Sequence, residues 1–291
     1  MRAFDFWIMM LCCLGWGTNF VVSTWALGGT SVPPFMLAAT RALLVLLMMG
    51  VFLFRPLPDK FLRLIFVSLC VGALHLGFLY TGFQTAPASG SSIISQAVIP
   101  IATVVSFFWL KETVSVSQGI AIIGAMIGVV IMVYEPGALR LDVGLMYVLA
   151  AYFVLAVGSV AVRTIPEIDW RVYVAWTAVV VLIFSVIVSA LFETDHKQVW
   201  SDDKMPLLIA AGYAAVGVSV FAHGQYFRLL QTYPVNKVVP LSLMITVFAT
   251  ILGVIFLKET LYPRYLLGAA LILPCVWFIS RGGAPAPVEM D

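Results

Sequence analysis

The feature that most constrains this chain is a series of long apolar runs interrupted only by short polar clusters. Of its 291 residues, 62% are hydrophobic and 10% are charged, whereas a soluble domain carries roughly 25% charged residues. The runs are about 18 to 25 residues long, enough for a helix to cross a hydrocarbon core of roughly 30 Å. Because a lipid-exposed backbone must satisfy its own hydrogen bonds, these runs predict membrane-spanning α-helices.

Charges, Gly/Pro turns and interfacial aromatic residues divide the chain into ten predicted spans. They cover 5–27, 33–54, 62–83, 89–110, 116–134, 143–163, 172–192, 206–227, 236–257 and 262–280. The first run lacks a small-residue cleavage pattern, so we expect it to remain as the first helix. The predicted fold class is an all-α membrane protein.

Composition argues against several other classes of protein. The net charge is only +2 and no block of Lys and Arg stands apart from the helices, so no nucleic-acid partner is expected. The four cysteines lie inside apolar runs without CxxC or Cys/His spacing, which predicts neither a disulfide framework nor a zinc site. No catalytic motif, metal or cofactor is predicted.

Lysine and arginine predict the orientation, because they are retained on the cytoplasmic side of a membrane. The segments on the side of the N-terminus carry ten: Arg2, Arg55, Lys60, Arg63, Lys111, Arg163, Arg171, Arg228, Lys237 and Arg281. The opposite segments carry five: Arg140, Lys197, Lys204, Lys258 and Arg264. We therefore expect both termini in the cytoplasm and the chain in the inner (plasma) membrane.

An internal repeat predicts the architecture. The tetrapeptide Leu-Lys-Glu-Thr at 110–113 returns 147 residues later at 257–260. Further matches in the same register pair Gln84, Thr85 and Pro87 with Gln231, Thr232 and Pro234, Ser95 with Ser242, and Ala102 and Thr103 with Ala249 and Thr250. Duplication explains one register with so many matches, and it divides the chain into repeats at 1–136 and 143–283. Since each repeat holds an odd number of spans, the second copy must be inverted, which places a ligand site near the membrane midplane.

The residues of both halves resemble the EamA branch of the drug/metabolite transporter superfamily. The pattern in the first half is Trp16, Gly17, Asn19, Phe20, Pro34, Arg41, Gln96, Pro100, Lys111-Glu112-Thr113 and Gln118. The pattern in the second half is Pro240-Leu241-Ser242-Leu243, Lys258-Glu259-Thr260 and Gly268-Ala269. The resemblance implies a ten-helix carrier with cytoplasmic termini that exports amino acids or similar metabolites. The surroundings of Pro240 look closest to exporters of cysteine and O-acetylserine. Val247 departs from the family's usual Pro, and Lys111 and Lys258 depart from its usual Gly.

Polar residues inside the spans are candidates for a transport path, because polar groups in hydrocarbon are costly. Span 4 carries Ser89, Ser92, Gln96, Pro100 and Thr103 at helical spacing on one face. Span 9 carries Ser242, Thr246 and Thr250. We interpret these stripes as walls of a cavity, while close helix packing is the alternative reading.

Ionisable residues give further candidates. His75 with Tyr80, and His223 with Tyr226, offer groups that bind a carboxylate or relay a proton; the alternative is a neutral histidine satisfied by a nearby hydroxyl or carbonyl. Arg41 is the cation well inside a span, with no Asp or Glu at comparable depth. It would attract a substrate carboxylate, or else snorkel to the interface.

Aromatic and amide side chains in spans 1, 6 and 7 complete the predicted site. Trp16, Asn19, Tyr152 and Trp176 suit an amino-acid or aromatic ligand, although aromatic residues also form interfacial belts. Glu112 and Glu259, at helix ends, are interpreted as structural. The predicted substrate-binding residues are Trp16, Asn19, Arg41, His75, Tyr80, Ser92, Gln96, Trp176, His223, Tyr226, Ser242 and Thr246.

The sequence thus predicts an exporter of small metabolites, most closely amino acids, that works by alternating access. A flippase for lipids or lipid-linked sugars, a channel and an intramembrane enzyme are the alternatives. The expected partners are a small-molecule substrate and membrane lipid, and the expected state is a monomer or weak homodimer.

Overall fold

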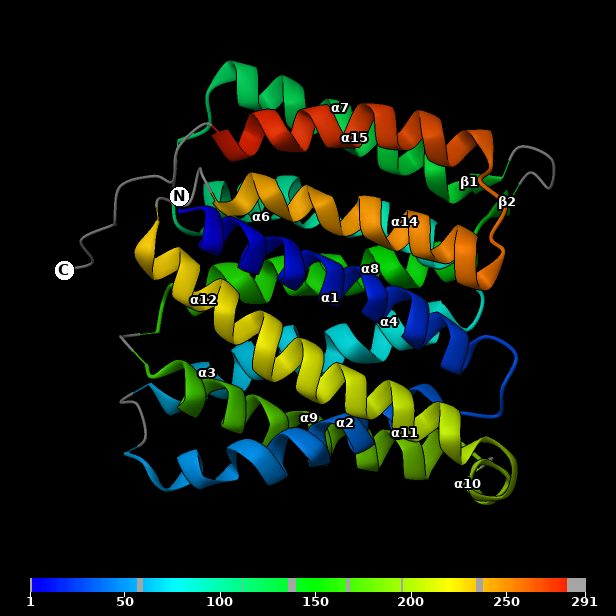
Figure 1. The fold of residues 1–291 in the computed structure, drawn as a ribbon. Coiled ribbons are helices and arrows are strands. Elements are labelled where there is room, and N and C mark those ends of the chain that lie inside the picture. The colour runs from blue at the N-terminus through cyan, green and yellow to red at the C-terminus, as the bar shows by residue number, and fades with distance from the viewer. Residues whose placement is uncertain are drawn as a thin grey trace.

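The computed structural model describes residues 2–56, 60–111, 113–135, 140–165, 168–194, 196–233 and 238–281, and these are almost entirely helical. The helices run back and forth beside one another in a bundle (Figure 1). The start of α1 and the end of α15 lie at the same end of this bundle, which we call the terminal end. The other end, where α1 finishes and α2 begins, is the opposite end.

The first half of the chain supplies the helices up to α7. They are α1 (Ala3–Leu27), α2 (Pro34–Met49) with the 3₁₀ helix η1 (Gly50–Phe54), α3 (Phe61–Ser68), the π-helix η2 (Leu69–Leu74), α4 (His75–Phe83), α5 (Ala88–Ser95), α6 (Val98–Trp109) and α7 (Val116–Val133). Two-residue strands β1 (Tyr134–Glu135) and β2 (Arg140–Leu141) pair antiparallel between the halves.

The second half begins with α8. Its elements are α8 (Val143–Val162), α9 (Trp170–Phe192), α10 (His196–Gln198), the π-helix η3 (Val199–Asp203), α11 (Lys204–Tyr213), the π-helix η4 (Ala214–Ala222), α12 (His223–Thr232), the 3₁₀ helix η5 (Val239–Leu243), α14 (Met244–Leu257) and α15 (Pro263–Arg281).

The all-helical prediction is confirmed, and helix is present in each of the ten predicted spans. Among the described residues, eight helical stretches are long and apolar enough to cross a membrane. The stretches Leu241–Leu257 and Pro263–Ile279 are apolar but shorter. Large apolar side chains point outward along the bundle, including Phe54, Leu62 and Val116, which are 91%, 83% and 82% exposed. Lipid is the solvent that suits such a surface.

Helices of the two halves pack against each other throughout the bundle. The closest neighbours are α1 with α14, α2 with α9, α4 with α8, α6 with α8, α5 with α14, and α7 with α15. Small residues let some of these backbones approach, as is common between membrane helices. A Cβ on Gly268 of α15 would lie 2.2 Å from the Met132 Cγ and 3.0 Å from the Gly128 carbonyl oxygen of α7.

The lysine of the Lys-Glu-Thr repeat has the same backbone conformation in both halves. Lys111 and Lys258 adopt left-handed conformations with φ of 58° and 57°. Glycine is the residue that takes this conformation without strain, which accounts for the glycine expected there from the family resemblance. The equivalent turns agree with duplication of the chain.

Candidate functional site

A buried arginine stands at the centre of the candidate site. Arg41 of α2 is 8% exposed, and it does not snorkel to an interface. Its Nη1 donates to the Tyr80 hydroxyl of α4 at 3.0 Å. Its Nε and Nη2 donate to the Ser219 hydroxyl of η4 at 3.3 and 3.0 Å. In the described part of the chain no carboxylate pairs with Arg41, so its charge is held by neutral hydroxyls.

Two histidines lie near this arginine, and each directly follows a π-helical stretch. Such stretches are frequent at functional sites. The Nδ1 of His75 is 3.1 Å from the Ala151 carbonyl oxygen, so Nδ1 is the donor there. The Arg41 charge acts electrostatically on both His75 and His223, so the three side chains lie around one region of the bundle.

Aromatic rings adjoin the second histidine. The Trp16 ring of α1 lies 5.6 Å from the His223 ring and 5.3 Å from the Tyr226 ring, measured between centroids. Asn19, one turn beyond Trp16 on α1, is buried, and its Oδ1 accepts no hydrogen bond from the described residues. A buried carbonyl oxygen without a donor is costly, so this atom is suited to a ligand.

The predicted stripe on span 4 forms a hinge-like break. Pro100 has no N–H to offer the Gln96 carbonyl, which instead accepts from Ile99 N at 3.3 Å, and the helix divides into α5 and α6. Gln96 lies at this break. Its Nε2 donates to the Thr246 hydroxyl of α14 at 3.2 Å, and that hydroxyl donates to the Ser92 carbonyl at 3.1 Å.

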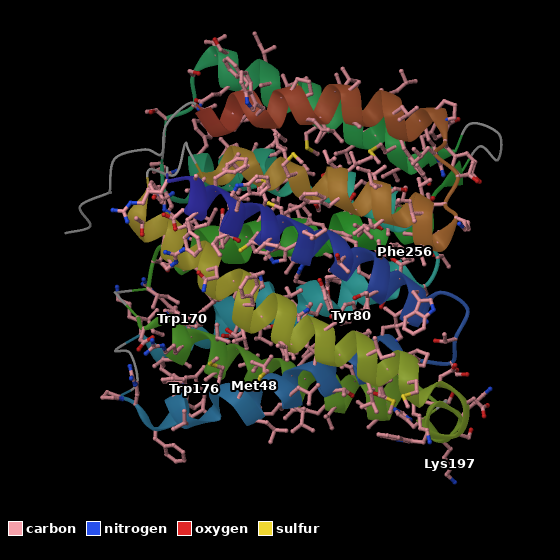
Figure 2. All side chains as sticks on the ribbon, viewed as in Figure 1. Met48, Tyr80, Trp170, Trp176, Lys197 and Phe256 are labelled. Atoms are coloured by element: carbon pink, nitrogen blue, oxygen red, sulfur yellow. The ribbon has the colours of Figure 1, made fainter. Side chains whose placement is uncertain are left out.

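Span 4 is joined to the histidine side of the cluster through Tyr152. The Tyr152 ring of α8 lies 5.2 Å from the His75 ring, and its hydroxyl lies beside Ser95. Gln96 Nε2 reaches the same Ser95 hydroxyl at 3.5 Å. Polar side chains of both halves therefore gather inside the bundle, where Figure 2 labels Tyr80, and we call them the polar cluster.

One predicted residue, Trp176, lies away from this cluster. Trp176 of α9 packs its ring on Phe61 at 5.0 Å, near Trp170 towards the terminal end and away from Tyr80 (Figure 2). Ser242 lies in η5, immediately before α14.

A depression of about 970 Å³ opens at the opposite end of the bundle. Its wall includes Thr24, Gln84, Asp142, Glu259, Arg264 and Tyr265. The Arg264 Nη2 pairs with Asp142 Oδ2 at 3.2 Å, so opposite charges meet on this wall. A second cavity of about 480 Å³ lies between α2 and the end of α9, and Glu193 and His196 line it.

One partner in the site, Ser219, was not predicted from the sequence. Ser219 is one serine among many in an apolar run, and its contact with Arg41 depends on how η4 packs against α2. Tyr152 was predicted as an aromatic residue suited to a ligand, whereas its position between His75 and Ser95 follows from the packing of α8. A buried arginine was the available signal, because such a group requires hydroxyl or carboxylate partners.

The apolar bundle and its internal polar cluster define a multi-pass membrane protein with a polar interior. The model of the EamA-like transporter family matches residues 4–134 and 142–281. The chain belongs to this family.

Individual relatives agree with the family. The chain is 29% identical to a "Probable amino-acid metabolite efflux pump" of Salmonella typhimurium, over 92% of each chain. It is 27% identical to a protein of the same name from Escherichia coli, over 91% of each. It is 26% identical to a chloroplastic WAT1-related protein of Arabidopsis thaliana, over 91% of this chain and 66% of the relative. One solved crystal structure is similar over 95% of this chain and 96% of its own, with a TM-score of 0.61 and 20% identity, which bears on the fold alone.

Proposed function

We propose that this chain exports amino acids or closely related metabolites by alternating access, with Arg41 as the anchor for the substrate carboxylate. The single observation that carries the proposal is the burial of the Arg41 guanidinium among neutral hydroxyls. An uncompensated buried charge is expensive, and ionisable groups at membrane depth commonly mark substrate paths. A substrate carboxylate would supply the missing counter-ion.

The hydrogen bonding of Arg41 leaves room for such a ligand. Tyr80 and Ser219 each occupy N–H groups of the guanidinium, while Nη1 and Nη2 each carry a second N–H. These two parallel donors match the two oxygens of a carboxylate. Tyr80 and Ser219 hold the guanidinium plane in position from helices of different halves.

The neighbouring residues suit the remaining parts of an amino acid. The unsatisfied Asn19 Oδ1 would accept a hydrogen bond from the substrate ammonium group. The Trp16 and Tyr226 rings would cover an apolar side chain. The names of the Salmonella and Escherichia relatives support the same chemical class.

The proposed architecture is ten spans in two inverted repeats, at 1–136 and 143–283. The protein would lie in the inner (plasma) membrane with both termini in the cytoplasm. Three observations support it: the 147-residue register of matches, the position of the start of α1 and the end of α15 at one end of the bundle (Figure 1), and the excess of Lys and Arg on that side. The terminal end is then cytoplasmic and the opposite end external. The repeats rock about the polar cluster and expose it to one end at a time.

Counterflow in proteoliposomes tests the role of Arg41. Vesicles with purified protein are preloaded with unlabelled amino acids, and uptake of labelled ones is measured in the presence of competitors. Amino acids should compete, whereas the corresponding amines without a carboxylate should not. Arg41→Gln should lower apparent affinity at least about tenfold, as expected when a charge-assisted pair is lost.

The matched control is Arg55→Gln, which removes an exposed arginine at the terminal end and should leave counterflow unchanged. Competition by amines as strong as that by the parent amino acids would contradict the proposal. So would unchanged affinity in Arg41→Gln.

A further inference from the structure

A glutamate from the second half holds the start of a helix from the first half. The backbone N–H of Ala88 donates to Glu259 Oε1 at 2.5 Å, and that of Ser89 donates to Glu259 Oε2 at 2.9 Å. These are the first two residues of α5. A carboxylate at a helix N-terminus gains from charge-assisted bonds and from the helix dipole.

The helix cannot supply this cap from its own sequence. The residue before α5 is Pro87, which has no side-chain acceptor, whereas Ser, Thr, Asp and Asn are the usual N-caps. The start of α5 therefore depends on Glu259 across the boundary between the halves.

The surroundings of Glu259 are shaped to hold its carboxylate in this position. Lys258 takes the left-handed conformation that ends α14 and turns the chain. A Cβ on Gly253 would lie 2.7 Å from Glu259 Oε2 and 3.1 Å from its Cδ, so only glycine leaves room for the carboxylate here. The Glu259 N–H also donates to the Gly253 carbonyl at 3.3 Å.

The contact brings together the two motifs that recur between the halves. Gln84, Thr85 and Pro87 lead directly into α5, and Lys258, Glu259 and Thr260 supply the carboxylate. Residues of both motifs line the depression at the opposite end. One and two turns further along, the same helix carries Ser92 and Gln96 of the candidate site.

We propose that Glu259 is a latch that closes the opposite end of the transporter, and that it leaves the α5 N-terminus when this end opens to release substrate. The inference rests on the alternating access proposed above, but not on the identity of the substrate. The latch has to break because it joins α5 of one repeat to the end of α14 in the other, and these repeats move apart at that end. Its bonds are to backbone N–H groups, so they re-form whenever α5 returns.

Thiol labelling tests the latch without any substrate. Ala86, which lines the depression but is 1% exposed, is replaced by Cys as a reporter for a membrane-impermeant maleimide added from the external side. The chain with only its native cysteines gives the background. Glu259→Gln should raise the labelling rate of the reporter about tenfold, the effect of weakening charge-assisted hydrogen bonds.

Two further variants sharpen the test. Gly253→Ala keeps the carboxylate but occupies its space, so it should raise labelling as Glu259→Gln does. Asp142→Asn is the matched control: Asp142 also lines the depression and caps a helix, but it bonds Leu145 and Arg264 of its own half. The reporter chain with Asp142→Asn should be labelled at the same rate as the reporter chain in which Asp142 and Glu259 are both intact.

Equal labelling rates in the Glu259→Gln variant and its parent would overturn the latch, provided that thermal unfolding curves show both proteins to be folded. An increase of the same size in Asp142→Asn would overturn it too, because loosening would then follow from losing any cap. Neither result depends on the Arg41 counterflow assay, so failure of the latch and failure of the proposed substrate class are separable.

Discussion

The two ends of the bundle join the same two halves with different chemistry. At the opposite end, carboxylates of the second half accept backbone N–H groups of the first. The Glu193 carboxylate accepts hydrogen bonds from Phe35 N and Met36 N at 2.8 and 3.1 Å. The Asp203 carboxylate accepts one from Ser31 N at 2.7 Å, and Glu259 accepts those of the α5 N-terminus. At the terminal end, arginine side chains make the contacts between the halves, and we call these contacts the terminal joints.

The arginines of the terminal joints are exposed, whereas the Asp5 carboxylate is buried. Arg55 pairs with Asp169, their side chains being 48% and 29% exposed. Arg228 donates to Asp5 at 2.9 Å, and Tyr233 donates to the same carboxylate at 2.6 Å. Arg63 donates to the Thr164 carbonyl at 3.0 Å. Exposed ion pairs contribute little to stability, whereas partly buried caps contribute more. We therefore expect the contacts at the opposite end to contribute more to stability than the exposed pairs at the terminal end.

The largest expected effect is loss of two opposite-end caps together. Glu193→Gln combined with Glu259→Gln should cost about 3 kcal/mol, since each carboxylate makes charge-assisted bonds to a helix N-terminus. Thermal unfolding in detergent should show a Tm lower by roughly 6 °C. The paired control, Arg55→Gln with Arg63→Gln at the terminal end, should shift Tm much less; an equal shift would erase the distinction between the ends.

A smaller effect is expected from Asp5→Asn, the most enclosed carboxylate among the terminal joints described. It would weaken the bonds from Arg228 and Tyr233 while keeping the volume of the side chain. Tm should fall by less than in the double cap variant, and Tyr233→Phe should produce part of the same decrease. A larger fall than that of the cap variant would reverse the ranking of the ends.

Arg55→Gln alone should have a still smaller effect. An exposed pair of this kind is worth about 0.5 kcal/mol or less, and salt screens it. The Tm difference from the parent protein should shrink further between low and high ionic strength. A difference that persists unchanged in high salt would show that the pair acts through more than surface charge.

The smallest effect is expected where the two halves share the same turn. Lys111→Gly and Lys258→Gly relieve the left-handed strain, but they add freedom to the unfolded chain. The two terms nearly cancel, so each variant should stay within about 0.5 kcal/mol of its parent in the same unfolding assay. A loss above that in one variant alone would show that the turns are not equivalent.

Much of the fold followed from the sequence because lipid imposes a simple rule on apolar runs. The predicted span at 33–54 became α2 and η1, and the span at 143–163 became α8, each within one residue at its ends. Span 4 divides into α5 and α6 around Gln96, because the N–H that Pro100 lacks would have bonded the Gln96 carbonyl four residues earlier.

The site was less predictable, because its contacts join residues far apart in the chain. Arg41 was identifiable as a charge without a carboxylate partner, yet Ser219 became its partner only through packing of η4. Glu259 was interpreted as a structural turn residue; its bonds to α5 depend on the left-handed Lys258 and on the space beside Gly253. The indole of Trp176 packs against Phe61, which no spacing within α9 indicates.

Alternating access is the central claim, and distances across the two ends test it most directly. Spin labels at Thr85 and Thr260 report the opposite end, and labels at Lys60 and Arg163 report the terminal end, each pair with one label in each half. Pulsed electron resonance in lipid nanodiscs should show the two distances changing in opposite senses when a transported amino acid is added. Changes in the same sense at both ends, or no change at either end with a substrate that is transported, would contradict the account.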